Sequence, residues 1–237
     1  MTSRRSTSRV AVIAGASGLV GSELLRRLQR ASAYDRVVAL TRRPLGMGER
    51  VVEVPARFDA LADALDSAVP AAASVDAFCC LGTTLGKAGS QAAFRHVDFD
   101  CVVAFGRWAA RRRARRLVVI SALGADAGSR VFYNRVKGEA EDALRALAGQ
   151  SVVLLRPSLL DGRRSEWRTG EFLALALTRP WRRLLPAAVR PVAVADVAQS
   201  MLDAALQDEA PAIVESAAMH GAAQRADARA AQANSMP

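Results

Sequence analysis

Apolar runs alternate with amphipathic segments along most of this chain. Each apolar run is too short for a helix and is typical of a buried strand, and we expect strands at 10–14, 36–40, 50–54, 75–82, 116–124 and 151–157. Between them apolar residues recur with helical spacing, which predicts helices at 22–30, from 58 onward, at 91–113 and at 131–147. Strands that alternate with helices predict an α/β fold, a doubly wound parallel sheet with right-handed connections.

The regular pattern loosens after Pro157. We expect the stretch of about 158–191 to be a small C-terminal substrate or lid segment. Its large apolar side chains are candidates for lining a pocket; they are Trp167, Phe172, Leu175 and Trp181. One alternative is plain core packing, and a less favoured one is contact with a membrane surface, because arginines interrupt the apolar residues here.

The chain has 237 residues, which is enough to bury one full core. We expect a single domain over 9–215, in which a helix at 192–206 and a short strand at 213–214 complete the pattern. The basic, hydroxyl-rich residues 1–8 are expected to form a disordered tail rather than a targeting segment. The alanine-rich residues 216–237 are expected to be a disordered or frayed tail.

Three glycines follow the first expected strand, in "VAVIAGASGLVGSELLRRL". Gly15, Gly18 and Gly21 span a strand-to-helix turn, where one glycine permits a tight turn, one lets the backbone approach a pyrophosphate, and one lets helix and strand pack closely. The first helical amides and the helix dipole then favour an anion. The sequence therefore predicts a dinucleotide site that also uses Ser17, Leu19 and Val20, although a purely structural glycine turn is the alternative.

The residues after the second expected strand indicate which dinucleotide would bind. In an NAD site an acidic residue usually stands there to bond the ribose 2′-hydroxyl, whereas this chain has Arg42 and Arg43. Guanidinium groups suit a 2′-phosphate, so we expect NADP(H) rather than NAD; a solvated arginine loop is the alternative. Asp59 is a candidate contact to the adenine edge, or equally a helix N-cap.

The fourth expected strand ends in "CCLGTTLGKAGS". Since ligands of open α/β sheets bind at the carboxyl ends of the strands, Leu81, Gly82, Thr83 and Thr84 are expected to pass the pyrophosphate or the nicotinamide ribose. Small residues there permit close approach. Lys87 either adds positive charge to this site or is an ordinary loop lysine.

A candidate catalytic set follows the fifth expected strand. Ser121 ends that strand, and Tyr133 and Lys137 share a helix face because they are four residues apart. Carbonyl reduction needs a proton donor beside the oxygen, and a free tyrosine, with a pKa of about 10, needs stabilisation of its anion by a neighbouring cation. We expect Tyr133 to act as general acid/base, Lys137 as its electrostatic partner and a ribose ligand, and Ser121 as the carbonyl anchor. An ordinary amphipathic helix is the alternative.

The composition narrows the range of partners. The formal net charge of +10 raises nucleic acid as a partner, but the arginines are scattered, and "RRRARR" at 111–116 closes a helix with no aromatic platform beside it. We therefore expect no nucleic-acid partner. Cys79, Cys80 and Cys101 form no disulfide or metal pattern, so we expect no metal site and a cytoplasmic protein. Long apolar helix faces suit a monomer or a homodimer.

The order of glycine turn, strand-end serine and Tyr-x-x-x-Lys resembles the short-chain dehydrogenase/reductase superfamily, in its atypical or extended branches. The segments "GASGLVG", "TRRP", "CLGTTLGKAG", "YNRVKGEAE" and "RPSLLDGR" together are similar to its Tat-interacting-protein-like group of NAD(P)H-binding proteins, over roughly 9–215. This resemblance implies a Rossmann fold, an NADP(H) cofactor, the roles given above for Ser121, Tyr133 and Lys137, and Pro157 and Ser158 near the nicotinamide.

Two functions follow from the resemblance. One is an NADP-dependent oxidoreductase that acts on a small-molecule carbonyl or quinone substrate. The other is an NADP(H)-binding regulatory protein without robust turnover, since some atypical members are of that kind. Some members also carry an active-site asparagine on the long helix before the fifth strand. Here Asp98 falls near that place, which is a departure at the proton relay.

Overall fold

A computed structural model describes residues 8–55, 60–147, 149, 151–161 and 186–234 of the chain. Its centre is a parallel sheet with the strand order β3-β2-β1-β4-β5-β6-β9. Every neighbouring pair in this sheet runs parallel. The strands are β1 (Arg9–Ala14), β2 (Arg36–Thr41), β3 (Val51–Pro55), β4 (Ser74–Cys79), β5 (Arg116–Ile120), β6 (Val152–Arg156) and β9 (Ile213–Glu215).

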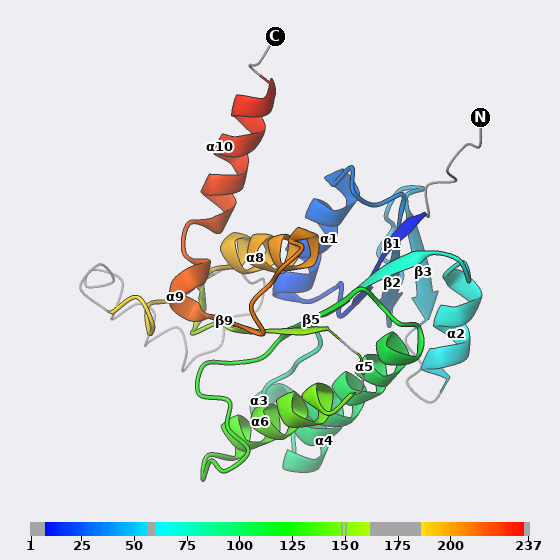
Figure 1. Ribbon diagram of the computed structural model, residues 1–237. Helices are drawn as coiled ribbons and strands as arrows, with labels where there is room; N and C mark the ends of the chain where they lie inside the picture. Colours follow the sequence, from blue (N-terminus) through cyan, green and yellow to red (C-terminus); the bar gives the residue numbers. More distant parts are fainter. Residues whose placement is uncertain (1–7, 56–59, 148, 150, 162–185, 235–237) are drawn as a thin grey trace, which may run out of the picture.

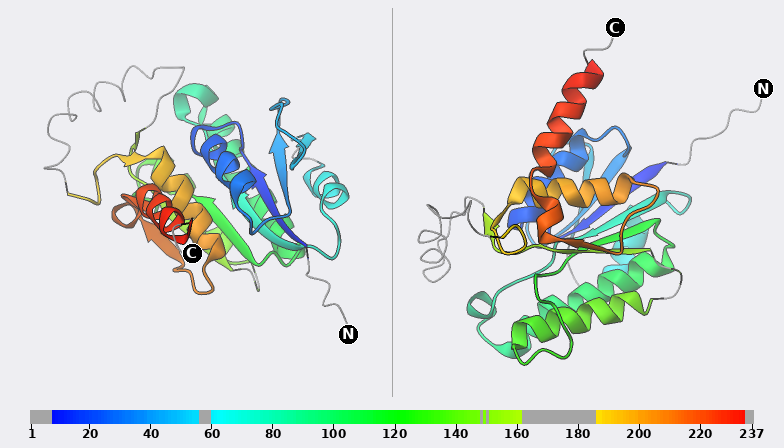
Figure 2. Two further views of the ribbon diagram at one scale, coloured as in Figure 1. Left: turned by 90° about the horizontal axis from the view of Figure 1, so that it is seen from above. Right: turned by 60° about the vertical axis from the view of Figure 1, so that its left-hand side comes forward.

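Helices cover both faces of the sheet (Figure 1). One face carries α1 (Leu19–Arg30) and α8 (Val194–Leu206), which pack on each other. The other carries α2 (Leu61–Ala68), α5 (Val102–Arg111) and α6 (Phe132–Arg145). The right-hand view of Figure 2 shows the sheet between the two layers. The expected doubly wound parallel sheet of the Rossmann type is therefore confirmed.

Alternating side chains of the strands fill the two cores. Ile13 of β1 belongs to the core beneath α1 and α8, while its neighbours Val12 and Ala14 belong to the core on the α5 side. A strand buried on both faces must be apolar at every position, which is why β1 is a continuous apolar run. Trp108 of α5 is buried among these side chains and donates its indole N–H to Asp66 Oδ1 at 2.9 Å.

A buried carboxylate ties the elements together at the amino ends of β1 and β4. Asp76 has no exposed side-chain surface and pairs with Arg9 at 2.7 Å and Arg115 at 3.1 Å. It also accepts the hydroxyl hydrogen of Tyr34 at 2.9 Å. Both arginines donate to the carbonyl of Ala205 at the end of α8. A buried charge that is paired and hydrogen-bonded in this way is structural, and it lies away from the carboxyl ends of the strands.

The helix expected at 91–113 contains an irregular segment. It begins as α4 (Gln91–Arg95), continues as a π-helical segment η1 (His96–Cys101), and becomes regular again in α5. It ends at Arg111, because Arg113 takes a left-handed conformation with φ of 49°. A π-helical turn holds one residue more than an α-helical turn and frequently marks a functional site. Asp98 lies within it.

The residues expected to form a frayed C-terminal tail are helical instead up to 234. They form α9 (Ser216–Met219) and α10 (Ala222–Asn234), and Met219 is fully buried. Asp196 of α8 accepts backbone N–H groups of Gly221 at 2.9 Å and Ala223 at 3.0 Å, which caps the start of α10. The later turns of α10 run out from the body (Figures 1 and 2).

A few further elements differ from those expected from the sequence. The short helix α3 (Leu85–Ala88) follows β4, and the two-residue strands β7 (Leu160–Asp161) and β8 (Val192–Ala193) pair beside the main sheet. The strand expected at 116–124 ends at Ile120. Most of the expected substrate segment, including Trp167, Phe172, Leu175 and Trp181, lies outside the described residues, as do Asp59 and nearly all of the expected N-terminal tail.

Candidate functional site

A cleft of about 1110 Å³ lies at the carboxyl ends of the central strands. Its walls come from the segments that follow β1, β2, β4, β5 and β6, and from α6. This is the edge at which open parallel sheets bind ligands. Most of the candidate site residues line it; from that set these are Gly15, Ser17, Gly18, Leu19, Val20, Arg42, Leu81, Gly82, Thr83, Thr84, Ser121, Tyr133, Lys137 and Pro157.

The glycine turn is shaped by backbone contacts. Gly15 has φ of 82°, and a Cβ there would lie 2.5 Å from the carbonyl oxygen of Cys80, at the end of β4. Gly18 precedes the first residue of α1, and no side chain caps that helix end. The amides that open α1 therefore face the cleft without a protein side chain capping them, which is the arrangement that binds an anion.

Gly21 serves the turn differently. A Cβ at this position would lie 2.8 Å from the carbonyl carbon of Gly15 and overlap its oxygen. Gly21 is therefore the glycine that lets α1 pack against the end of β1, and it does not itself line the cleft.

The two arginines after β2 differ in their placement. Arg42 lines the cleft, whereas Arg43 is exposed and is not among the lining residues. The turn is held by Thr41, whose hydroxyl donates to the carbonyl of Arg43 and accepts the Arg43 amide at 3.2 Å. This turn brings one of the two expected arginines into the cleft.

The segment after β4 forms the cleft wall between the glycine turn and α6. Thr84 caps α3 by accepting the amide of Lys87 at 3.2 Å. A Cβ at Gly82 would lie 3.4 Å from Asp98 Oδ1 and 3.6 Å from Lys137 Nζ. The backbone at Gly82 thus passes close to the side chains of both Asp98 and Lys137.

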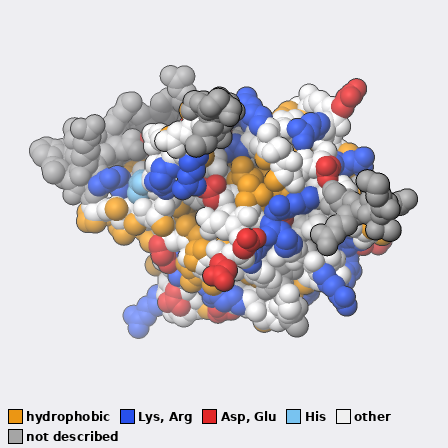
Figure 3. Space-filling model, turned by 45° about the horizontal axis from the view of Figure 1, so that its top comes forward, with side chains coloured by type: hydrophobic (Ala, Val, Ile, Leu, Met, Phe, Trp, Pro, Cys, Tyr) orange, Lys and Arg blue, Asp and Glu red, His pale blue; other side chains and the backbone are white. Residues whose placement is uncertain are grey.

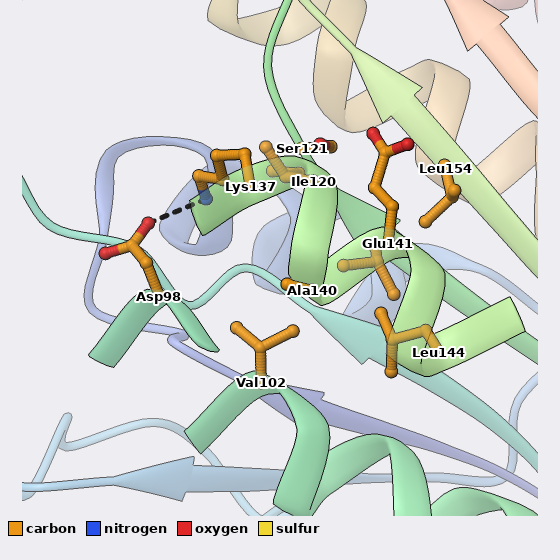
Figure 4. Close-up of a pocket in the computed structure, with 10 residues that line it drawn as sticks. Asp98, Val102, Ile120, Ser121, Lys137, Ala140, Glu141, Leu144 and Leu154 are labelled. Atoms are coloured by element: carbon orange, nitrogen blue, oxygen red, sulfur yellow. Dashed lines mark ion pairs between the residues drawn. The ribbon is translucent and has the colours of Figure 1, made fainter. Parts of the chain in front are cut away.

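Lys137 and Asp98 form a buried ion pair, with 2.7 Å between Nζ and Oδ1 (Figure 4). The second carboxylate oxygen of Asp98 accepts the amide of Thr83 at 2.8 Å. Burial alone would lower the pKa of Lys137, but the charge of Asp98 and, after it, Tyr133 outweigh burial and raise that pKa above its ordinary value. Lys137 therefore stays protonated throughout the neutral range.

Tyr133 lies one turn before Lys137 on α6 and also lines the cleft. Its ring packs against Phe94 of α4 with 5.5 Å between centroids. This contact fixes the ring plane, while the i, i+4 spacing puts the phenol and the ammonium on the same helix face. The helix that carries them is held close to the preceding loop, since the amide of Asp126 donates to the carbonyl of Asn134 at 3.0 Å.

Ser121 lies directly after β5, between the cleft and the carboxylate of Glu141. Its hydroxyl oxygen is buried and is turned towards that carboxylate in Figure 4. Glu141 in turn accepts from Arg156 Nε at 2.9 Å and from Arg145 Nη2 at 2.8 Å. Burial alone would raise the pKa of Glu141, but the hydrogen bonds and positive charge of Arg156, with the charge of Arg145, outweigh burial and lower it.

Two of these residues add to the expected set. Asp98 stands at the suspected place on the long helix, and its direct contact with Lys137 follows from the π-helical segment, which the residue pattern did not predict. Glu141 was missed, although its signal is present: Tyr133, Lys137 and Glu141 recur every four residues and so lie along one stripe of α6.

Charged and apolar side chains are mixed on the surface that Figure 3 shows. On the face drawn in Figure 3, Lys and Arg side chains are interspersed with acidic and apolar ones. Among the described helices, none has the length and apolarity needed to span a bilayer. No group of three or more His, Cys, Asp or Glu side chains suited to a metal occurs in the described part of the chain.

The fold and the order of the motifs define the class of this protein as an atypical short-chain dehydrogenase/reductase. Protein FMP52, mitochondrial, of Eremothecium gossypii is 35% identical over 160 residues, which cover 68% of this chain and 70% of that protein. Protein HTATIP2 of Rattus norvegicus is 34% identical over 163 residues, or 68% and 67% of the two chains. The chain belongs to the family of these proteins, the Tat-interacting-protein-like group.

Solved structures agree with the fold. MoeE5, determined in complex with UDP-glucose and NAD, superimposes with a TM-score of 0.63 at 20% identity, over 86% of this chain and 74% of that one. No known family profile matches the chain.

The expectation of a cytoplasmic protein is contradicted, because relatives such as the FMP52 proteins are named mitochondrial. The cysteine usage was therefore an insufficient ground for that expectation.

Proposed function

We propose that this protein is an NADP-dependent oxidoreductase of the short-chain dehydrogenase/reductase type, acting on a carbonyl or quinone substrate. One observation carries the proposal: an uncapped helix N-terminus, a guanidinium group, and the pair Tyr133 and Lys137 line the same cleft. An ordinary amphipathic helix needs no such convergence.

The cleft fits a nicotinamide dinucleotide. Gly15 and Gly18 line the cleft beside the first turn of α1, where a pyrophosphate would lie. A Cβ at Gly15 would lie 2.5 Å from the carbonyl oxygen of Cys80, so glycine is what allows the turn that leads into these helix amides. Arg42 is the guanidinium that would bind a 2′-phosphate by charge-assisted hydrogen bonds. Gly82 and Thr83 lie between the first turn of α1 and Lys137, and a ribose would lie beside them. A bound nicotinamide supplies the hydride that the reduction requires.

The residues of the chain supply the proton and hold the substrate. Tyr133 gives its phenolic proton to the carbonyl oxygen as that oxygen gains charge, and the O–H bond of the phenol breaks as the new one forms. Lys137, held protonated by Asp98, stabilises the resulting phenolate and donates to the ribose. Ser121 reaches the carbonyl oxygen by rotation about its Cα–Cβ bond, away from Glu141.

A single substitution tests this assignment. Tyr133→Phe removes one oxygen and is expected to lower turnover of a carbonyl panel by about 10²-fold or more, while NADPH binding is kept. Tyr34→Phe is the matched control, because Tyr34 bonds Asp76 at the opposite end of β4, and it is expected to retain turnover. Full activity in Tyr133→Phe would refute the role of the phenol.

The Asp98–Lys137 pair also favours a second function. The carboxylate of Asp98 lies 2.7 Å from the ammonium of Lys137 and offsets the positive charge that would stabilise a Tyr133 phenolate. Weaker stabilisation of the phenolate suits a protein that binds NADP(H) and regulates a partner without robust turnover. Tight NADPH binding by the wild-type protein, together with no turnover on aldehydes, ketones or quinones, would support this second function over the first.

A further inference from the structure

The cleft has two chemically different ends. The charged side chains that line it are Arg42, Lys87, Asp98 and Lys137, all of which belong to the cofactor side or to the ion pair beside α6. From the segments after β5 and β6, and from the stretch before β8, the lining side chains described are uncharged. Among the described residues, the part of the cleft beyond Ser121 and Tyr133 therefore has an uncharged wall.

Large apolar side chains gather at that wall. Within the described residues, six large hydrophobic side chains are notably exposed, and four of them line the cleft. Leu123 at 37%, Leu159 at 43% and Val189 at 48% belong to this wall, whereas Leu85 at 42% lies on α3. Single exposed apolar side chains are ordinary, but their concentration at one place marks a binding surface.

Backbone hydrogen bonds hold this wall in shape. The amide of Leu123 donates to the carbonyl of Pro157 at 2.9 Å, and the amide of Val192 donates to the carbonyl of Leu159 at 2.9 Å. Leu160 pairs with Val192 in the β7–β8 ladder. The backbones of Leu123 and Leu159 are therefore held by hydrogen bonds. Leu123 lies two residues after Ser121, and Leu159 lies two residues after Pro157.

The one hydroxyl group in this part of the wall already has an acceptor. Ser158 donates its hydroxyl hydrogen to the carbonyl of Arg190 at 2.5 Å, and its amide donates to Ser216 Oγ at 3.2 Å. A sugar or a nucleotide needs several polar partners at its binding site, whereas an alkyl chain needs none.

We infer that the substrate of this site is a carbonyl compound with an apolar chain, which lies along Leu123, Leu159 and Val189 while its oxygen reaches Tyr133. This inference rests on the proposed oxidoreductase function. An apolar substrate differs from the sugar nucleotide in the superimposed structure of MoeE5, which was determined with UDP-glucose.

The test compares aldehydes that differ only in chain length. With NADPH, kcat/KM is expected to rise about twofold for each methylene added from propanal to octanal, or roughly 30-fold in total, since a groove wall buries only part of each methylene. In the double variant Leu123→Ser, Leu159→Ser the octanal-to-propanal ratio should fall several-fold. Leu206→Ser, which changes an equally exposed leucine at the end of α8 outside the cleft, should leave that ratio unchanged.

A binding measurement keeps the inference separate from the proposed function. Octanamide and propanamide are titrated calorimetrically into the protein with NADPH present. Tighter binding of octanamide that is lost in the double variant supports the apolar subsite even if no aldehyde turns over, in which case only the proposed function fails. Equal kcat/KM along the aldehyde series, equal binding of the two amides, or preferential binding of UDP-glucose would overturn the inference.

Discussion

The buried pair of Asp98 and Lys137 makes the sharpest energetic prediction. Asp98→Ala leaves the Lys137 ammonium, whose side chain is 7% exposed, without its counter-charge, and leaves the amide of Thr83 without an acceptor. Breaking one partner of a buried ion pair typically costs about 3–5 kcal/mol. We therefore expect the free energy of unfolding, measured by urea denaturation at pH 7, to fall by about 3–5 kcal/mol.

A control on α6, the helix that carries Lys137, isolates burial as the cause. Asp142 pairs with Arg145 at 3.1 Å, but its side chain is 63% exposed. Asp142→Ala is expected to cost about 0.5 kcal/mol or less, as exposed pairs do. The reasoning is refuted if the two alanine variants lose similar amounts of stability.

The pH dependence of stability adds a test of sign. In the wild-type protein the pKa of Lys137 is raised above its usual 10.5, so the stabilisation is fully present below pH 10.5 and is lost only as the pH rises through the higher folded value. In Asp98→Asn the charge of Asp98 is gone while burial, the largest single effect on Lys137, remains, and we therefore expect the pKa of Lys137 to fall. The contribution of Lys137 to the stability of that variant should then increase with pH towards 10.5, opposite in sign to the wild type. If the free energies of unfolding of the two proteins, measured in urea, changed with pH in the same way, Asp98 would not be the cause of the raised pKa of Lys137.

Two further substitutions test other parts of the site. Gly21→Ala places a Cβ 2.8 Å from the carbonyl carbon of Gly15 and should lower the melting temperature clearly, whereas Gly86→Ala, with open space around it, should not; equal melting temperatures would show that the turn adapts. For Glu141, whose pKa lies below its usual 4.5, the stabilisation is present above pH 4.5 and is lost as the pH falls through the folded value. The stability difference between wild type and Glu141→Gln should therefore shrink in acid, and a difference independent of pH would exclude this linkage.

Much of the fold was predictable because its signals are local. Strands buried on both faces must be apolar throughout, and a proline or glycine often follows their last residues. The observed bounds of β1, β2, β3 and β6 therefore lie within one or two residues of the expected positions. The cleft was predictable from the same information, since parallel strands that end together bring their next residues together.

The remaining features depend on contacts distant in sequence. An irregular turn such as η1 changes no residue pattern, so the direct Asp98–Lys137 contact had no signal in the sequence. The start of α10 is capped by Asp196, 27 residues before Ala223, and an alanine-rich segment with no visible partner was expected to fray. The strands β7 and β8 are too short to show any periodicity.

The proposed function requires that the glycine turn and Arg42 form a working NADP(H) site. The most direct measurement titrates the protein with NADPH and with NADH, following nicotinamide fluorescence, and repeats both titrations on Arg42→Ala. We expect NADPH to bind more tightly, and the substitution to weaken NADPH binding by about tenfold or more while NADH binding changes little. Binding of neither nucleotide would show that the glycines serve the fold alone, and the proposed oxidoreductase function would fail with them.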